Sequence, residues 1–262
     1  MGDHRQHHDP SGIIAGRHPV REALKAGKPL HRILLKRGVE PALVQEMLSL
    51  ARAAGVPVQM VDGRRLDALV GGLNHQGVVA IGLARGYYTL DQLLDEVNRS
   101  RRPGLLLLLD GLQDPHNLGS LLRSCDAAGA HGVIIPKRRS VGLTAAVAKA
   151  SAGAVEHVPV AQVVNLARTM EILKEAGFWL VGGDMAGDYL PWEVDMRGPV
   201  GVVIGGEGEG MSRLVRERCD YLVRLPMQGK VASLNAGVAG ALLLFEAVRQ
   251  RWPDSKSGDG TG

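Results

Sequence analysis

The sequence predicts an α/β fold in two parts, a small N-terminal unit and a larger domain built on a parallel sheet. Between residues 104 and 251, runs of Val, Leu and Ile that suit buried strands alternate with segments of helical periodicity. This alternation is typical of a parallel sheet with helices on both faces. A shorter alternation fills residues 13–84 and ends before a polar, basic stretch. Polar turns follow several predicted strands, where such a sheet presents its ligand site.

The small unit, residues 13–84, is expected to alternate strands with helices. Pro19 and Pro41 stand at predicted helix starts, and a glycine follows each of these helices, as is usual for helix ends. The predicted strands are 13–16, 32–35, 56–61 and 78–83, and the predicted helices are 19–26, 41–54 and 65–70. Residues 85–102 hold a polar helix with a basic end, and we interpret them as a linker.

The larger domain, residues 103–252, is expected to continue the alternation to its last helix. Its predicted strands are 105–109, 132–136, 155–160, 178–183, 200–204 and 221–225. Its predicted helices are 117–129, 142–150, 163–176, 212–217 and 233–251. The polar segments 1–12 and 253–262 have no pattern that could bury apolar surface, so we predict disordered tails.

Composition limits the kinds of function. The chain has 262 residues, of which 45% are apolar and 22% charged, as in a globular protein. Only 3% are aromatic, which argues against a recognition surface of stacked aromatic rings. The net charge is +4, and basic clusters near predicted strand ends indicate either phosphate contacts or a solvated surface. These clusters are Arg101-Arg102, Lys137-Arg138-Arg139 and the series Arg213, Arg216 and Arg218.

The cysteines and acidic residues give no sign of a metal centre. Cys125 and Cys219 lie far apart without a CxxC spacing, which indicates a reducing compartment and small buried thiols rather than zinc ligands. Asp110 and Asp114 are not spaced as a metal cage. No apolar run approaches a membrane span, and the N-terminus lacks the apolar core of a signal peptide, so we expect a cytoplasmic protein without membrane contact.

Three loops at predicted strand ends carry the polar residues of a candidate site. They are residues 114–124, 202–212 and 225–235, and the middle one contains Gly206-Glu207-Gly208-Glu209-Gly210. Those glycines alternate, so the G-x-G-x-x-G spacing of a dinucleotide site is absent, and the two glutamates would repel a pyrophosphate. A nicotinamide-dependent dehydrogenase is therefore disfavoured, and we expect a turn that lets the main chain approach a ligand closely.

Each polar candidate has a purely structural alternative. Asn117 and Ser233 stand where a helix N-cap is expected, and Arg123 could lie on a solvated helix surface. Several such residues at strand ends, beside Glu207, are less credible as unrelated caps than as one site. The candidate site therefore comprises Asn117, Arg123, Glu207, Ser233 and Asn235.

The three loops resemble the signature motifs of the SpoU (TrmH) family of RNA ribose 2′-O-methyltransferases. The resemblance extends over residues 13–251. Gly16-Arg17-His18-Pro19-Val20 and the loop His75-Gln76-Gly77 are similar to the RNA-binding domain of the RlmB subgroup. Residues 165–170 and 245–251 are similar to the same subgroup. The implied fold is α/β of the SPOUT type, with a trefoil knot in the C-terminal methyltransferase domain and a smaller RNA-binding domain before it.

The resemblance implies a donor, a substrate and an assembly. The donor is S-adenosyl-L-methionine, and the positions that match its binding residues are Gly205, Leu225 and Leu234. The substrate is a guanosine ribose of 23S ribosomal RNA rather than DNA, and the assembly is a homodimer with the RNA site across its interface. The sequence departs from the family at Ala236-Gly237, where relatives carry Val-Ser, and this places a glycine inside a helix.

The resemblance also implies which residues act on the ribose hydroxyl. The family assigns proton removal to Arg123. An arginine in a protein keeps its proton, so the alternative is a cationic role that stabilises charge on the 2′-oxygen. Asn117, Ser233 and Asn235 would orient Arg123 and the hydroxyl. Glu207 would fix its loop and accept a hydrogen bond from Arg123, and no metal takes part.

Other functions are open at this point. Within the family, the substrate could be transfer RNA, or the methyl group could confer resistance to an antibiotic that targets the ribosome. From another class, the chain could be a non-catalytic RNA-binding factor of ribosome assembly. The intact set of polar candidates favours an enzyme, because a protein that had lost catalysis should have lost part of the set.

Overall fold

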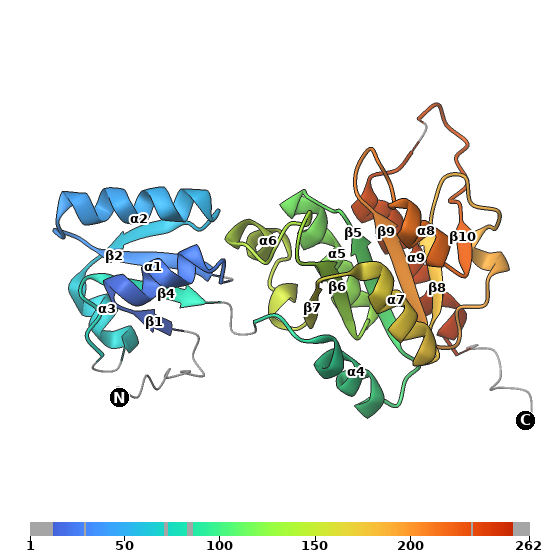
Figure 1. The fold of residues 1–262 in the computed structure, drawn as a ribbon, viewed down its shortest axis with the longest axis horizontal. Coiled ribbons are helices and arrows are strands. Elements are labelled where there is room, and N and C mark those ends of the chain that lie inside the picture. Colours follow the sequence, from blue (N-terminus) through green and yellow to red (C-terminus); the bar gives the residue numbers. More distant parts are fainter. Residues whose placement is uncertain (1–12, 29, 71–72, 83–85, 232, 254–262) are drawn as a thin grey trace, which may run out of the picture.

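The computed structural model describes residues 13–28, 30–70, 73–82, 86–231 and 233–253, which form two lobes (Figure 1). The predicted tails lie outside these residues, apart from Pro253. Each lobe has its own sheet, and no strand of one sheet pairs with the other among the described residues. None of the described helices is long and apolar enough to cross a bilayer.

The smaller lobe is a four-stranded sheet with helices on both faces. Its strands are β1 (Ile13–Ala15), β2 (Leu30–Lys36), β3 (Val58–Val61) and β4 (Val78–Gly82), in the spatial order β1-β4-β2-β3. Strand β4 runs antiparallel to β1 and β2, whereas β2 and β3 are parallel. The helices α1 (Arg17–Lys25) and α2 (Pro41–Ala53) cover one face, and α3 (Gly63–Val70) covers the other.

The larger lobe is a six-stranded sheet in which every neighbouring pair of strands is parallel. In spatial order its strands are β10 (Tyr221–Val223), β8 (Trp179–Gly183), β9 (Val200–Gly205), β5 (Leu105–Asp110), β6 (Gly132–Pro136) and β7 (Val160–Val163). Its helices are α4 (Leu90–Arg99), α5 (Pro115–Ala128), α6 (Ala145–Ala150), α7 (Leu166–Glu175), α8 (Arg213–Arg218) and α9 (Ala236–Arg251). The predicted α/β class, a parallel sheet preceded by a smaller unit, is confirmed.

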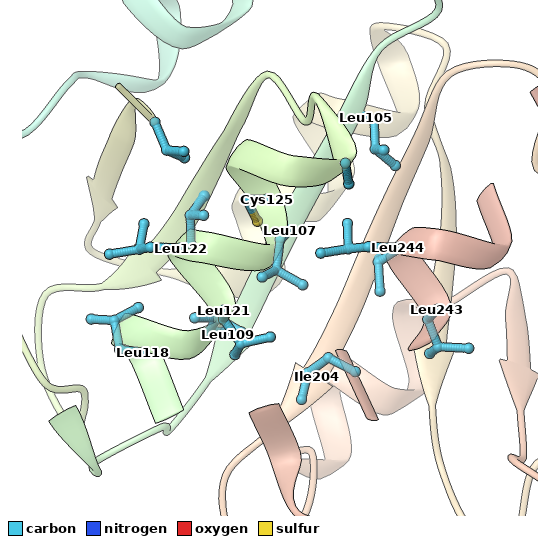
Figure 2. Close-up of a cluster of buried hydrophobic side chains, with 14 of the residues drawn as sticks. Leu105, Leu107, Leu109, Leu118, Leu121, Leu122, Cys125, Ile204, Leu243 and Leu244 are labelled. Atoms are coloured by element: carbon cyan, nitrogen blue, oxygen red, sulfur yellow. The ribbon is translucent and has the colours of Figure 1, made fainter. Parts of the chain in front are cut away.

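Two apolar layers hold the larger sheet between its helices. Successive residues of β5 face opposite sides, so Leu107 joins the layer under α5 and α9, whereas Leu108 joins the layer under α4, α7 and α8. Figure 2 shows the first layer, in which leucines of α5 and α9 meet those of β5. Each buried leucine contributes roughly 2 kcal/mol. This layer therefore fixes the positions at which α5 and α9 begin.

One predicted strand in the larger lobe was wrong. Residues 155–160 are not a strand, because a 3-10 turn covers Ala154–Glu156 and β7 begins only at Val160, the last residue of the predicted strand. Val155 and Val158 are both buried. They are three residues apart, which matches the period of a 3-10 turn rather than the two-residue period of a strand.

Three helices begin later than predicted, because a side chain caps each of them. The capping residues are Thr144, Asn165 and Asn235, and each accepts a hydrogen bond from a main-chain N–H of the first helical turn. The predicted helices 142–150, 163–176 and 233–251 therefore begin at Ala145, Leu166 and Ala236.

The segment interpreted as a linker, residues 85–102, packs onto the larger lobe where the structure describes it. Helix α4 buries Leu93 and Val97 in the layer under the sheet, and Tyr88 forms a parallel bridge with Ala161 of β7. The sequence did not indicate this packing because α4 is polar on most of its surface, and the domain boundary stays a prediction. Two apolar residues four positions apart are enough to seat one face of a short helix.

The connection between β8 and β9 passes around the outer edge of β10. The Val223 oxygen accepts a hydrogen bond from Asp184 N at 2.9 Å, on the β8 side of the strand. The Leu222 oxygen accepts one from Tyr189 N at 3.2 Å, and Arg224 N donates to the Tyr189 oxygen at 2.9 Å. Successive carbonyls of a strand point to opposite edges, so Tyr189 lies beyond β10. Residues 184–189 therefore run from the β8 side of β10 to its outer edge.

Candidate active site

The loops that follow β5 and β9 start side by side at the carboxyl edge of the larger sheet. Asp110 lies opposite Gly205 at the ends of the two strands. The Asp110 main-chain oxygen accepts a hydrogen bond from Gly206 N at 2.8 Å, and its carboxylate accepts one from Ser212 N at 2.7 Å. Asp110 thereby closes the glycine-rich loop. Sequence analysis missed this role, although a carboxylate directly after a buried strand was a usable signal.

Three of the five predicted catalytic residues meet at this edge. Asn117 Nδ2 donates a hydrogen bond to Glu207 Oε1, and Asn235 Nδ2 donates one to Asn117 Oδ1 at 2.9 Å. Asn117 is 7% exposed, and so belongs to the few buried polar side chains of the described chain. Residues 90 and 118 positions away in sequence supply its partners. We call Glu207, Asn117 and Asn235 the amide relay.

The direction of the amide relay follows from the start of α9. Asn235 Oδ1 accepts hydrogen bonds from Gly237 N at 2.9 Å and Val238 N at 3.3 Å, as an N-cap does. The amide nitrogen of Asn235 must then point away from the helix, toward Asn117 Oδ1. Asn117 in turn presents its own nitrogen to the Glu207 carboxylate. The cap of one helix thereby orients a carboxylate on another loop.

Two structural alternatives from the sequence are corrected by these caps. Asn117 is not the N-cap of α5, because Asp114 holds that position and accepts a hydrogen bond from His116 N at 2.9 Å. Ser233 is not the N-cap of α9, because Asn235 is. With Pro115 fixing the first turn of α5, Asn117 faces inward to the amide relay.

Glycine at position 237 fits the amide relay closely. A Cβ on Gly237 would lie 3.0 Å from Asn235 Oδ1 and 3.3 Å from Asn117 Oδ1. A larger side chain therefore requires the two amides to shift. Glycine at position 237 thus permits the close contact between the starts of α5 and α9.

Asn235→Ala is expected to lower the free energy of unfolding by about 2 kcal/mol, because it removes a cap and leaves Asn117 Oδ1 without its donor. Asn235→Asp keeps an acceptor for the cap but turns a carboxylate oxygen, in place of the donor, toward Asn117 Oδ1, so a loss of about 1 kcal/mol or more is expected. Urea unfolding measures both. Asn98→Ala, on the exposed side of α4, is the control and should change stability by less than about 0.5 kcal/mol. Wild-type stability in both Asn235 variants would contradict the amide relay.

The other two predicted catalytic residues lie outside the amide relay. Arg123 follows Asn117 by six positions on α5, so its side chain projects about 120° around the helix from that of Asn117, and it is exposed. It makes no hydrogen bond or ion pair with another described residue. Ser233 is also exposed, just before the cap of α9. Both side chains face solvent.

The predicted cofactor positions surround the last loop. Gly205 is buried, and a methyl group on it would overlap the main chain of Gly210 and Met211. Leu225 packs on the apolar layer under α9, whereas Leu234 is 36% exposed. The main chain of residues 225–231 and 233–234 makes no backbone hydrogen bond within the described chain. A ligand that is held by main-chain groups and an apolar side chain fits this loop.

The two cysteine thiols are not reactive groups of the site. Burial raises the pKa of the Cys125 thiol, and burial together with the charge of Asp220 raises the pKa of Cys219 to about 12. Both thiols are therefore protonated near neutral pH. No group of three His, Cys, Asp or Glu in the described part of the chain is arranged to hold a metal ion.

The basic clusters predicted to touch phosphate differ in their surroundings. Each arginine of α8 pairs with a carboxylate: Arg213 with Glu217 at 2.8 Å, Arg216 with Asp184 at 2.7 Å and Arg218 with Glu171 at 2.7 Å. Their charges are thus compensated, which favours the solvated surface for this series. The clusters 101–102 and 137–139 have no such partner among the described carboxylates, and their phosphate contacts stay a prediction.

The fold and the site define a class of protein: a parallel α/β enzyme with its ligand loops at one sheet edge, preceded by a small α/β module. The model of the SpoU rRNA Methylase family matches residues 104–245. The model for RNA 2′-O ribose methyltransferase substrate binding matches residues 13–84. The chain therefore belongs to the SpoU (TrmH) family of RNA 2′-O-methyltransferases.

Relatives and solved structures agree with this membership. A putative TrmH family tRNA/rRNA methyltransferase of Bacillus subtilis, YacO, is 47% identical over 248 residues, which cover 95% of this chain and 98% of that protein. One from Staphylococcus aureus is 48% identical over 241 residues, which cover 91% and 96%. The SpoU methyltransferase AviRb of Streptomyces viridochromogenes, solved in complex with AdoMet, has a TM-score of 0.60 at 29% identity, over 91% and 90% of the chains. An RNA 2′-O ribose methyltransferase has a TM-score of 0.55 at 32% identity, over 94% and 92%.

Proposed function

We propose that this protein transfers a methyl group from S-adenosylmethionine to the ribose 2′-hydroxyl of a guanosine in 23S ribosomal RNA. The observation that carries the proposal is the amide relay, in which three distant motif residues meet at the carboxyl edge of the sheet. Residues 13–84 would bind the RNA and residues 103–252 would catalyse the transfer. An rRNA substrate implies a cytoplasmic enzyme.

The cofactor loop supports this donor. Gly205 lets the glycine-rich loop cross β9 closely. Leu225 and Leu234 flank a loop whose described main chain, residues 225–231 and 233–234, makes no backbone hydrogen bond with other described residues. S-adenosylmethionine, when bound, supplies an electrophilic methyl group. In this proposal Leu225 and Leu234 contact its apolar surface and the loop main chain binds its polar groups. The path of the β8–β9 connection around β10 supports a knotted domain, with the last loop inside the knot.

The residues around the relay would act on the hydroxyl. Ser233 would orient the ribose, and the relay would hold the start of α9 and the Glu207 loop in fixed register. Arg123 keeps its proton, so it would bind the neighbouring phosphate and stabilise the negative charge that develops on the 2′-oxygen while the hydroxyl proton passes to water. The new bond between carbon and oxygen would form as the bond between the methyl carbon and sulfur breaks, which leaves S-adenosylhomocysteine. Orientation supplies much of the rate in such a transfer, because the methyl carbon and the oxygen must meet in line.

A homodimer accounts for the exposed position of Arg123. Val238, Leu242 and Phe245 form an exposed apolar stripe on α9, at the spacing of one helix face. Helices α5 and α9 pack side by side on the same face of the sheet, so a partner on this stripe also covers the exposed side of α5. We infer that a second copy docks here and that Arg123 completes the partner's site.

Leu242→Glu is expected to convert the dimer into monomers, because it places a charge in the centre of the apolar stripe. Light scattering after size exclusion measures the mass, and methyl transfer should fall with it. Leu214→Glu on α8 is the matched control, since Leu214 is 49% exposed and Leu242 is 47% exposed. The proposed interface would be wrong if Leu242→Glu stayed dimeric, or if Leu214→Glu dissociated as well.

Two measurements test the proposed function. Thermal-shift titration should show stabilisation by S-adenosylmethionine and none by NAD, because bound ligand stabilises only the state that binds it. Mapping of 2′-O-methyl groups in RNA from a strain that lacks the gene should show one guanosine of 23S RNA unmethylated. Loss of a methyl group from transfer RNA instead would overturn the assignment of 23S RNA as substrate, but it would agree with ribose 2′-O-methylation as the reaction. If the 2′-O-methyl groups of all RNA were unchanged and S-adenosylmethionine did not raise the melting temperature, the proposal that the protein is a methyltransferase would be wrong.

A further inference from the structure

The segment between the two lobes bonds to a loop of the larger sheet. Tyr87 lies between β4 and α4, and its phenol oxygen accepts a hydrogen bond from Leu143 N at 2.7 Å. A Cβ on Gly142 would lie 2.7 Å from the same oxygen, so the tyrosine fits the main chain of this loop closely. Tyr87 packs on the layer under α5, whereas Tyr88 packs on the layer under α4. The amide relay uses neither tyrosine.

The loop beside this tyrosine, residues 137–144, connects β6 to α6, and we call it the basic arm. Val141 N donates a hydrogen bond to the Leu112 oxygen at 2.8 Å, which joins the basic arm to the loop after β5. Beyond the arm, α6 crosses α5 so closely that a methyl group on Gly119 would overlap Ala150. These contacts hold the basic arm beside α5 and the loop before it.

The basic arm lies close to the amide relay. Gly111 stands between the two: a Cβ on Gly111 would lie 3.9 Å from the Arg139 oxygen, and a Cβ on Gly206 would lie 2.5 Å from the Gly111 oxygen. Gly206 directly precedes Glu207 of the relay. In the sheet, β6 and β9 flank β5, so they are about 10 Å apart at the usual spacing of strands. The basic arm therefore borders the candidate active site at the carboxyl edge.

The cations of the basic arm are exposed and uncompensated. Lys137, Arg138 and Arg139 form no ion pair with a described carboxylate. The adjoining loop carries Asp110 and Asp114, whose carboxylates accept hydrogen bonds from main-chain N–H groups instead. Arg139 has a φ of 59°, in the left-handed region that is uncommon for a residue with a side chain. Such strain persists where surrounding contacts impose it, and it is concentrated at ligand sites.

We propose that the basic arm binds phosphates of the RNA strand that carries the target ribose, and that Tyr87 is the positioning residue that holds the arm in place. This role rests on the proposed function and adds a phosphate site within the catalytic lobe itself. Exposed cations with no carboxylate partner suit phosphate oxygens, whose contacts fix the register of a nucleic acid without reading its bases. The RNA strand would run along the carboxyl edge, from the relay over the end of β5 to the end of β6. Arg101 and Arg102 stand before β5, at the opposite edge, and take no part in this site.

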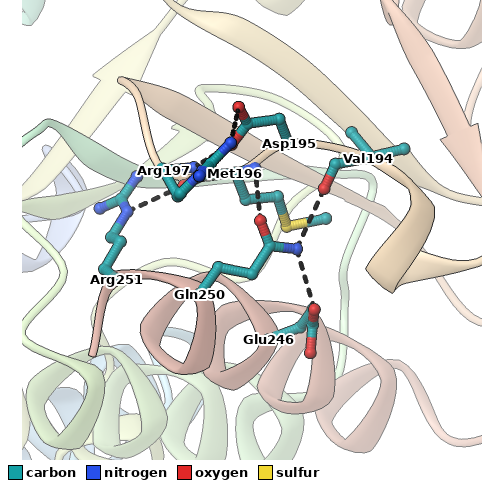
Figure 3. Close-up of polar contacts among 7 residues, drawn as sticks. All are labelled: Val194, Asp195, Met196, Arg197, Glu246, Gln250 and Arg251. Atoms are coloured by element: carbon teal, nitrogen blue, oxygen red, sulfur yellow. Dashed lines mark hydrogen bonds and ion pairs between the residues drawn. The ribbon is translucent and has the colours of Figure 1, made fainter. Parts of the chain in front are cut away.

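The test compares two double variants of the full-length protein with equal loss of charge. Arg138→Gln/Arg139→Gln alters the basic arm. Arg99→Gln/Arg197→Gln is the control, because both residues are exposed and lie at the amino edge, where Arg99 ends α4 and Arg197 stands before β9. Each pairs with a neighbouring carboxylate, as Figure 3 shows for Arg197. Single-turnover methyl transfer to an oligonucleotide with the target and its flanking nucleotides gives the RNA concentration at half-maximal rate and the plateau rate.

The basic-arm variant should need about 10-fold more RNA for half-maximal rate and lose roughly one to two units of salt slope, because two phosphate contacts are lost. Its plateau rate should fall less than its affinity for RNA, since contacts to distant phosphates stabilise the bound substrate and the transition state alike. Its affinity for S-adenosylmethionine should stay within about 2-fold of wild type, and so should the RNA requirement of the control variant.

Tyr87→Phe tests the positioning role, because it removes only the phenol oxygen that accepts the hydrogen bond from Leu143 N. It should raise the RNA concentration at half-maximal rate by about 3- to 10-fold, the usual effect of one lost hydrogen bond. Added to Arg138→Gln/Arg139→Gln, it should cost less than about 2-fold more, since a residue that acts through the arm loses its effect with the arm. Tyr88→Phe, on the other layer, is the matched control and should stay within about 2-fold of wild type.

Several results would overturn this inference alone. They are a wild-type RNA requirement and salt slope in the basic-arm variant, equal weakening in the control variant, and a loss from Tyr87→Phe that multiplies with the loss from the two arginines. Absence of methyl transfer to any RNA by the wild-type protein would instead overturn the proposed function.

Discussion

Arg123→Ala is expected to reduce the rate of methyl transfer by roughly 10²- to 10³-fold, the usual effect of removing one group that stabilises a developing oxyanion. Arg123 is exposed on α5 and is not among the residues proposed to hold S-adenosylmethionine, so the affinity for this cofactor should not change. Single-turnover kinetics on the RNA substrate, with cofactor binding measured separately, separate the two effects.

Arg123→Lys distinguishes the two roles open to this residue. A lysine keeps the positive charge but loses the planar fork, so partial activity is expected if Arg123 acts as a cation. A proton acceptor would instead give a rate that rises steeply with pH in Arg123→Lys, because lysine releases its proton more readily. Normal methylation by Arg123→Ala would remove Arg123 from the mechanism under either role.

Gly205→Ala is expected to destabilise the larger lobe by about 3 kcal/mol or more, because the added methyl group overlaps main chain that cannot rotate away. For a chain of this size the melting temperature should fall by roughly 6–12 °C. Stabilisation by S-adenosylmethionine should disappear as well, since the glycine-rich loop must move off the end of β9. Differential scanning calorimetry with and without the cofactor measures both effects.

Gly198→Ala is the matched control for this substitution. No heavy atom lies within 4 Å of a Cβ at Gly198, and its φ is not positive. Its stability should stay within about 0.5 kcal/mol of wild type. Wild-type melting and cofactor response in Gly205→Ala would show that the close crossing at Gly205 is not needed.

The sequence predicted the class of fold well, because buried parallel strands leave continuous apolar runs. The leucine run of β5 and the valine-rich β9 stood out for that reason. Short elements were harder. The turn at Ala154–Glu156 buries only two apolar residues, and such spacing does not separate a strand from a turn. Helix α4 was predicted as a helix, but the burial of its Leu93 and Val97 was not predicted.

The structure brings together three of the five candidate residues, and the sequence did not predict their contacts. Motif residues at strand ends indicated Asn117, Glu207 and Asn235, and hydrogen bonds now join them. The backbone conformation and the neighbouring segments decide which residue caps a helix and which bonds to another loop. Asp114 and Asn235 are therefore the N-caps, a role that the sequence suggested for Asn117 and Ser233. In the proposed dimer Arg123 would act in the partner's site, and the spacing of motifs within one chain does not show which subunit's site it completes.

The most direct measurement is methyl transfer by the purified protein, with labelled S-adenosylmethionine and protein-free 23S RNA. The proposed function predicts one labelled nucleoside, a 2′-O-methylguanosine, at a phosphodiester bond that resists alkaline hydrolysis because its 2′-oxygen is blocked. Label on a base, or no label on any RNA while the cofactor is bound, would contradict it.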